Sequence, residues 1–247
     1  MSSWVGRRLP RLDDPAILQG RGRYVADIAT SADWWAVFIR SPHASGRVVS
    51  ITAPDNVPLY LAADISAKPI SPVLERPDYV ESPMPILAGE VVRFAGEPIA
   101  VVLGRSQAEA EDFAELVEVD INPDKPVLDM DDAINPNTRA VHFDSAGHER
   151  NTVVDSRLTT DNFDKHMADC DHKTTIEVIS SRQSAVPIET RGSFVEHDRR
   201  SGKSTLTTST QMPHVVRTGI CDVLGIQARD LRVIAPDVGG AFGAKMA

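Results

Sequence analysis

The fold of this chain is indicated most clearly by Asp237-Val-Gly-Gly-Ala-Phe-Gly-Ala-Lys245, which follows the apolar run Leu231-Arg-Val-Ile-Ala-Pro236. The apolar run predicts a short β-strand, so the two stretches together indicate a strand that enters a glycine-rich turn. Three glycines within five positions allow positive φ and let the backbone approach a bound group closely. The spacing matches neither the dinucleotide fingerprint nor the P-loop, because Lys245 is not followed by Ser or Thr. A ligand-binding loop and a tight hairpin turn both remain open at this point.

Composition restricts the class of protein. The chain has 247 residues, of which 42% are hydrophobic and 25% charged, enough for one large or two small domains. Its formal net charge of -9 argues against a nucleic-acid-binding or anionic-membrane-binding surface. No apolar run approaches the roughly 20 residues that span a bilayer. Arg7 and Arg8 could suggest an export signal, but the following residues 9–20 carry charges where an apolar segment is needed, so we expect a cytoplasmic location.

Cysteine and histidine usage argues against a metal centre held by side chains of this chain. Cys170 and Cys221 are the two cysteines, and an iron–sulfur cluster needs four ligands. His43, His197 and His214 show no metal-ligand spacing. We therefore expect no metal ligands among the side chains and two reduced thiols.

The first half of the chain contains short β-branched runs. Strands are predicted at Trp35–Ile39, Arg47–Ile51, Pro98–Leu103 and Leu116–Ile121. Between the last two, residues 106–115 are rich in helix formers, with Ser106 as the N-cap and Glu109 as its capping-box partner. A strand, helix, strand unit is the prediction there.

The second half begins with a stretch rich in Asp, Pro and Asn, residues 122–162, which is typical of a surface linker. Strands are then predicted at Thr174–Ile179, Ser193–His197 and Ser204–Thr210. A short amphipathic helix is predicted at Val215–Leu224, ended by Gly225.

Six stretches, in the same order along the chain, resemble the large, molybdenum-cofactor-binding subunit of the xanthine dehydrogenase, aldehyde oxidase and carbon monoxide dehydrogenase family. They are Gly6-Arg-Arg-Leu-Pro-Arg-Leu-Asp-Asp-Pro15 with Gly20-Arg-Gly-Arg-Tyr-Val-Ala-Asp27; Arg40-Ser-Pro-His-Ala44; Gly96-Glu-Pro-Ile-Ala-Val-Val102 with Ala108-Glu-Ala-Glu-Asp112; Pro187-Ile-Glu-Thr-Arg-Gly192; Thr208-Ser-Thr-Gln-Met-Pro-His214; and the terminal glycine-rich loop. The resemblance covers nearly all of this chain but only the N-terminal part of the family's subunit.

The resemblance implies an α+β fold in which an α/β hammerhead domain is followed by the start of a molybdenum-cofactor-binding domain. We expect an N-terminal arm at residues 1–21, the hammerhead domain at 22–130, a linker at 131–165 and an incomplete cofactor domain at 166–247.

The resemblance also implies cofactor-binding residues. Gln211 corresponds to the family's glutamine beside the molybdenum, although an exposed glutamine at a strand end would otherwise be the simpler interpretation. Gly239, Gly240, Ala241, Phe242 and Gly243 form the loop whose amides approach the metal oxygen and the pterin, with the Phe242 ring in the substrate channel. Met246 stands where xanthine-oxidising members have Glu, which argues against xanthine itself as the substrate.

Glu189 and Arg191 are two apart on an extended segment and can pair with each other or with neighbours, so we expect them to be structural.

The reaction implied by the resemblance is oxidation of an aldehyde or N-heterocycle with water as the oxygen source. The family's general base is a Glu beyond this chain, so no residue here is assigned as catalytic. We expect iron–sulfur and FAD partner subunits, and a chain that supplies the rest of the cofactor domain and shares the molybdenum–pterin cofactor.

An alternative hypothesis is a truncated or split module without catalytic activity that serves in assembly or protein interaction. Both hypotheses predict that the chain by itself is inactive. We also expect Val233, Ile234, Val238 and Phe242 to lie on an unfinished surface.

Overall fold

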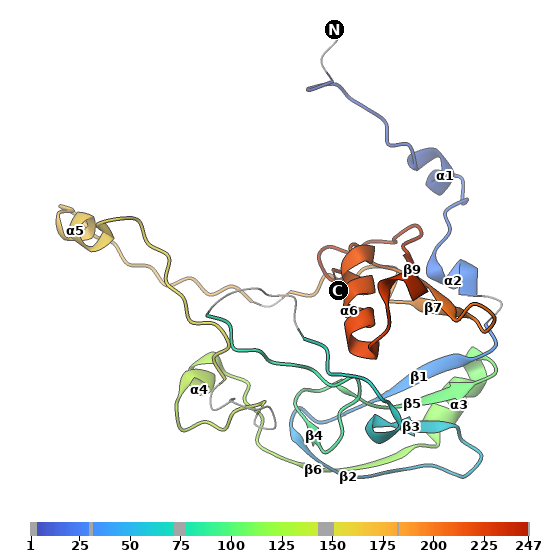
Figure 1. Ribbon diagram of the computed structural model, residues 1–247. Helices are drawn as coiled ribbons and strands as arrows, with labels where there is room; N and C mark the ends of the chain where they lie inside the picture. The colour runs from blue at the N-terminus through green and yellow to red at the C-terminus, as the bar shows by residue number, and fades with distance from the viewer. Residues whose placement is uncertain (1–3, 30–31, 72–77, 143–150, 182, 247) are drawn as a thin grey trace. The chain divides into compact units, whose positions relative to one another are not determined.

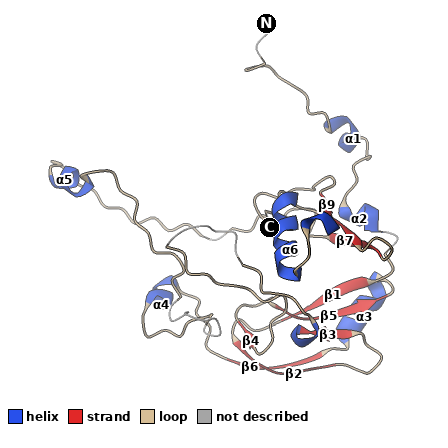
Figure 2. Ribbon diagram, viewed as in Figure 1, coloured by secondary structure: helices blue, strands red, loops and turns tan. Residues whose placement is uncertain are grey.

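The computed structural model describes residues 4–29, 32–71, 78–142, 151–181 and 183–246. Helices and sheets form two compact units (Figures 1 and 2). Asp33–Gln183 form one unit, and Met1–Ala32 join Ser184–Ala247 in the other. The N-terminal segment therefore packs with the C-terminal segment, far away in the sequence.

The unit Asp33–Gln183 is built on two antiparallel sheets of three strands. The first has the order β1 (Trp35–Arg40), β5 (Pro98–Gly104), β3 (Leu59–Leu61), and the second has the order β4 (Val91–Val92), β2 (Gly46–Thr52), β6 (Glu118–Pro123). β5 is central because its run of β-branched and apolar residues suits a strand with neighbours on both sides, and Ile99 and Val102 are fully buried. Strands of both sheets contribute to one apolar core, which contains Val92, Ile99 and Ile121.

The helix α3 (Gln107–Glu115) packs on β5 and β1 and begins at the predicted N-cap. The Ser106 hydroxyl accepts a hydrogen bond from the Glu109 amide at 3.1 Å. The Glu109 carboxylate accepts from the amide of Arg105, not from that of Ser106, so only half of the predicted capping box forms. The predicted strand, helix, strand order is present, but β5 and β6 belong to different sheets.

The rest of this unit carries short elements: η2 (Ala62–Asp64), α4 (Met130–Ile134) and α5 (Phe163–Ala168). α4 interrupts the predicted linker because the Asp129 carboxylate caps it, accepting from the amides of Asp131 and Asp132. The strand predicted at Thr174–Ile179 is wrong: these residues are outside any strand, and Ile176, Val178 and Ile179 are 77%, 78% and 87% exposed. β-branched residues favour a strand when they pack on a neighbour, and no described residue pairs with this segment.

The other unit contains α1 (Asp14–Leu18), α2 (Val25–Ile28) and a three-stranded sheet ordered β7 (Ser193–Asp198), β8 (Lys203–Thr208), β9 (Leu231–Ile234). β7 and β8 are antiparallel, whereas β8 and β9 are parallel and joined by α6 (Pro213–Leu224) and η3 (Ala228–Asp230). α6 begins at Pro213, whose ring suits the first turn of a helix, and it ends at Gly225 with φ 66° as predicted. This β–α–β unit positions the candidate site.

In the described part of the chain, no helix has both the length and the apolar character needed to cross a membrane.

Candidate functional site

The candidate site lies beyond the carboxyl ends of β8 and β9. Because these strands are parallel, the segments that leave them emerge at the same edge of the sheet. Thr208 leads into Gln211, and Ile234 leads into the glycine-rich loop. A hydrogen bond of 2.8 Å from the backbone amide of Gln211 to the Lys245 carbonyl joins the two segments. The structure therefore brings together Gln211 and the loop Gly239–Gly243, the two segments that the sequence singled out.

The interior of this site is polar. Thr207, Thr208, Ser209 and Thr210 are all buried, with between 4% and 8% of each residue exposed. The Thr210 hydroxyl donates to the Lys245 carbonyl at 3.1 Å and accepts from the Met212 amide at 3.1 Å. The hydroxyls at this end of β8 thus fix the chain on either side of Gln211.

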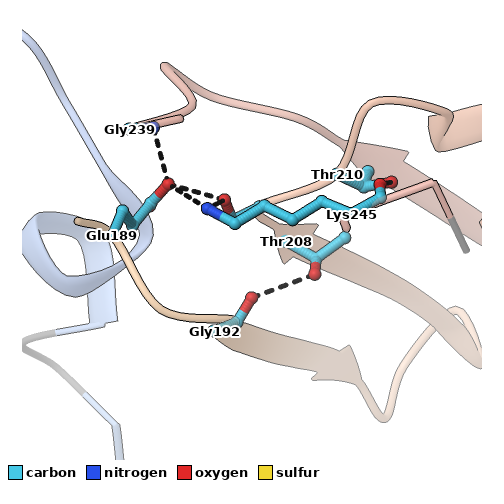
Figure 3. Close-up of polar contacts among 7 residues, drawn as sticks. Glu189, Gly192, Thr208, Thr210, Gly239 and Lys245 are labelled. Atoms are coloured by element: carbon cyan, nitrogen blue, oxygen red, sulfur yellow. Dashed lines mark hydrogen bonds and ion pairs between the residues drawn. The ribbon is translucent and has the colours of Figure 1, made fainter. Parts of the chain in front are cut away.

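Glu189 connects the site to a third segment (Figure 3). One of its carboxylate oxygens, Oε2, accepts hydrogen bonds from the Ser209 hydroxyl at 2.6 Å, the Gly239 amide at 2.7 Å and the Lys245 ammonium at 3.0 Å. The Lys245 ammonium also donates to Ser209 Oγ at 2.8 Å. We call Glu189, Ser209, Gly239 and Lys245 the loop anchor. Its members are up to 56 residues apart in sequence, so they hold the loop to β8 and to the residues before β7.

Burial makes the loop anchor a strong restraint. The Lys245 side chain is 1% exposed and that of Glu189 is 16% exposed. Burial raises the pKa of Glu189, but hydrogen bonds from Ser209 and the Gly239 amide, followed by the hydrogen bond and charge of Lys245, outweigh it. The net pKa of Glu189 therefore lies below its ordinary value, and the group is ionised at neutral pH.

The loop backbone requires glycine at two positions for different reasons. A Cβ on Gly239 would lie 2.5 Å from Glu189 Cβ, so the close approach of the loop to the anchor needs a residue without a side chain. Gly240 has φ 94°, which residues with a side chain rarely adopt. Phe242 also has positive φ, 50°, and its ring is exposed, with 78% of the residue accessible. Non-glycine residues held at positive φ cluster at active sites and ligand-binding positions, so Phe242 is a candidate for function.

The loop presents unused hydrogen-bond donors. Within the described chain, no acceptor is bonded to the amides of Gly240, Ala241, Phe242 and Gly243, or to the exposed side-chain amide of Gln211. Successive backbone N–H groups in a turn with positive φ form a concavity that binds anions. This donor set fits a group that carries anionic oxygen or sulfur atoms.

Glu189 and Lys245 contribute more to the site than their sequence context indicates. Glu189 was expected to pair with Arg191 or a neighbour, but it pairs with Lys245, while the Arg191 guanidinium donates to the Ala244 carbonyl at 2.5 Å. Glu189 and Arg191 therefore both support the glycine-rich loop, which agrees with the structural role expected for them. Spacing along the chain carries no signal of a contact between residues 56 positions apart.

In the described chain, the side chains of the other candidate groups form no hydrogen bond with Gln211 or with the loop. His197 shares a hydrogen bond of 2.9 Å with the Ser204 hydroxyl, and His214 is exposed. Cys170 is exposed and Cys221 is half-buried, and neither forms a disulfide. Among the described residues, His, Cys, Asp and Glu side chains form no group of three that could hold a metal ion. Of the expected unfinished surface, Phe242 is exposed, whereas Val233, Ile234 and Val238 are half-buried.

Comparison with known protein families matches both parts of the chain. Residues 19–125 match the aldehyde oxidase and xanthine dehydrogenase a/b hammerhead domain, and residues 145–247 match the molybdopterin cofactor-binding domain. The chain belongs to the xanthine dehydrogenase and aldehyde oxidase family of molybdenum enzymes. The α+β fold expected from the sequence, a hammerhead domain followed by the start of a cofactor-binding domain, is confirmed. The exact domain boundaries expected from the sequence stay predictions.

Relatives in this family match nearly the whole chain. The chain is 31% identical to the nicotine 6-hydroxylase large subunit of Paenarthrobacter nicotinovorans, over 98% of this chain and 30% of that protein. It is 29% identical to the carbon monoxide dehydrogenase large chain of Afipia carboxidovorans, over 98% of this chain and 32% of that protein. The crystal structure of quinoline 2-oxidoreductase from Pseudomonas putida 86 superposes with a TM-score of 0.85 at 30% identity, covering 99% of this chain and 32% of that one. The chain thus spans about a third of the length of these relatives.

Proposed function

We propose that this chain supplies the N-terminal part of the catalytic subunit of a molybdenum hydroxylase. The observation that carries the proposal is the convergence of Gln211 and the loop Gly239–Gly243, with free donors, at one edge of the sheet. When bound, the molybdenum–pterin cofactor supplies two-electron oxidation of a carbon centre with oxygen from water.

The residues of this chain bind and orient that cofactor. The amides of Gly240 to Gly243 would donate to its anionic atoms, and the Gln211 side chain would supply a further donor. The loop anchor keeps these donors in one arrangement, so their orientation is established before the cofactor binds. The exposed ring of Phe242 lines the approach of the substrate.

The proposed substrate is an aldehyde or an N-heterocycle. N-heterocycles are the first class to test, since nicotine and quinoline, which appear in the names of two relatives about 30% identical to this chain, are N-heterocycles. The general base of the reaction is assigned to polypeptide outside this chain. The iron–sulfur clusters are assigned there too, because two cysteines cannot provide four thiolate ligands. FAD is likewise assigned to a partner subunit, and the location is proposed to be cytoplasmic.

The test is a co-expression experiment. We expect this chain by itself to bind little molybdenum, and the complex with polypeptides that match the rest of a relative's large subunit and its partners to contain molybdenum and oxidise N-heterocycles or aldehydes. A complex that assembles without molybdenum would favour the alternative, a module without catalytic activity that serves in assembly.

Gln211→Ala sharpens the test. Removing one preorganised donor should lower the turnover rate of the complex by about 10²–10³-fold and leave the folding of the chain unchanged. Gln227→Ala is the matched control, because Gln227 is also an exposed glutamine of this unit but lies before η3, away from the loop. Equal rates for the wild type and Gln211→Ala would contradict the role of Gln211.

A further inference from the structure

A second polar feature of this unit lies away from the loop. A cavity of about 460 Å³ is lined by the first turns of α6, by η3 and by the beginnings of β8 and β9. Five of its lining residues are basic or histidine and one is acidic: Lys203, His214, Arg217, Arg229, Arg232 and Asp230. We call it the basic cavity. It includes the beginnings of β8 and β9, whereas Gln211 and the glycine-rich loop follow their carboxyl ends.

The charge of the basic cavity is opposite to that of the protein. The chain carries a formal net charge of -9, yet four Lys and Arg side chains share this cavity with one carboxylate. Asp230 lies 3.9 Å from Arg229, its neighbour in the sequence, and the side chains are 39% and 77% exposed. In the part of the chain that the structure describes, Lys203, Arg217 and Arg232 form no ion pair. Like charges brought together in a concavity repel one another, so the arrangement favours an anion among them.

Arg217 adds a second observation. Its Nε is buried and has no hydrogen-bond acceptor among the described residues. A buried donor without an acceptor is unfavourable, and a guanidinium binds oxyanions through two parallel N–H groups. The same cavity includes Pro213 and His214, at the N-terminus of the 12-residue helix α6, where the helix dipole also favours negative charge.

We propose that the basic cavity binds a phosphate-bearing small molecule, with Arg217 and Arg232 as its main contacts. A volume of about 460 Å³ is within the range of small-molecule sites and large enough for a diphosphate with an attached group. A compact concavity with several guanidinium groups suits phosphate better than it suits an extended acidic peptide, which needs a long groove. This site is independent of the proposed hydroxylase function, because none of the residues assigned to the molybdenum–pterin cofactor lines it.

The test is calorimetric titration of the full chain with inorganic pyrophosphate at low ionic strength, with sodium chloride of equal ionic strength as the blank. We expect saturable binding at one site with a Kd below about 1 mM, typical of a small ligand held by a few charged contacts. Arg217→Gln and Arg232→Gln should each weaken binding about tenfold or more, since each removes a charge-assisted contact. Arg217→Lys should give an intermediate loss, because it keeps the charge and loses the planar fork.

Arg199→Gln is the matched control, an exposed arginine of the same unit that does not line the cavity. Its affinity should equal that of the wild type. Arg232 is also exposed, so Arg232→Gln keeps the test decisive if Arg217→Gln folds poorly. No heat above the chloride blank, or equal losses in Arg199→Gln and Arg232→Gln, would overturn the proposal. Binding of an oligoglutamate peptide but not of pyrophosphate would also overturn it, and would show that the cavity is a protein interface.

Discussion

The two compact units differ in the balance of apolar and polar residues that they bury. In Asp33–Gln183 the largest fully buried side chains are Val92, Ile99 and Val102, all apolar. In the other unit, Thr207 to Thr210 and Lys245 are buried around the end of β8. Figure 3 shows Thr208, Thr210 and Lys245 there. Apolar packing is non-directional and tolerates change if volume is kept, whereas buried polar groups are stable only when each finds its partner. The polar interior therefore specifies one arrangement of the loop, which a binding site needs.

Among the described residues, each unit has an ion pair that is largely buried, and the two pairs differ in sequence separation. Arg93 and Glu97 are four residues apart, bonded at 2.9 Å, with 7% and 4% of their side chains exposed. Lys245 and Glu189 are 56 residues apart. A pair that is close in sequence stabilises one turn of chain, but a distant pair links segments that would otherwise be independent. The glycine-rich loop depends on such a link.

The largest effect is expected from Lys245→Met. It leaves the buried Glu189 carboxylate without its cation, and breaking a buried pair in this way costs about 3 kcal/mol, at the lower end of the range because part of Glu189 is exposed. The opening free energy of β8, measured by hydrogen exchange of its amides, should fall by this amount.

The exposed pair Arg47–Glu90, at 3.4 Å, provides the comparison in the other unit. Arg47→Met should change the opening free energy of β2 by about 0.5 kcal/mol or less, because exposed pairs are screened by water. A second check is the double variant Glu189→Leu with Lys245→Met, which should recover only part of the loss, because the Ser209 hydroxyl and the Gly239 amide would still lack their acceptor. A loss from Lys245→Met below about 1 kcal/mol would mean that the polar interior is not what holds the loop.

A smaller effect is expected from Gly239→Ala. The added Cβ would meet Glu189 Cβ at 2.5 Å, so either the loop or the anchor must shift, at about 2 kcal/mol. Gly219→Ala is the control within the same unit, since a Cβ there meets nothing within 4 Å in α6 and should stabilise the helix by about 0.5–1 kcal/mol. A thermal midpoint below that of the wild type for Gly239→Ala and above it for Gly219→Ala would support the close approach of the loop to Glu189. Midpoints shifted in the same direction would contradict it.

The smallest effect concerns pH. Because the pKa of Glu189 is lower in the folded chain than its ordinary value of 4.5, its contribution to stability is complete above 4.5 and is lost as the pH falls through the folded value. Hydrogen bonds from Ser201 and the Arg200 amide also lower the pKa of Asp198, so the wild type has more than one acid-sensitive group in this unit.

The difference between the wild type and Glu189→Gln isolates the contribution of the anchor. Thermal unfolding followed from pH 6 to pH 3 should show a steeper loss of stability in the wild type than in Glu189→Gln. Parallel curves would show that the charge of Glu189 adds nothing to the stability of this unit.

Local signals predicted the elements that form by local rules. The strand β5 follows from its run of β-branched residues, α3 from the Ser106 cap and the end of α6 from Gly225. The strand predicted at Thr174–Ile179 does not form. Strand propensity acts through packing on a neighbouring strand, and the described chain provides none there. The same limit applies to pairing, because no local pattern states that β8 lies beside β9.

The sequence by itself determined the family, most of the longer strands and helices and the two candidate segments, Gln211 and Gly239–Gly243, because motifs and strand runs are properties of neighbouring residues. Only the tertiary structure decided that Glu189, Ser209 and Lys245 share one contact, that Lys245 is buried and that four basic side chains share a cavity. The physical reason is distance along the chain. Burial and charge pairing depend on which remote segments meet, and the parallel β8–α6–β9 arrangement determines that meeting.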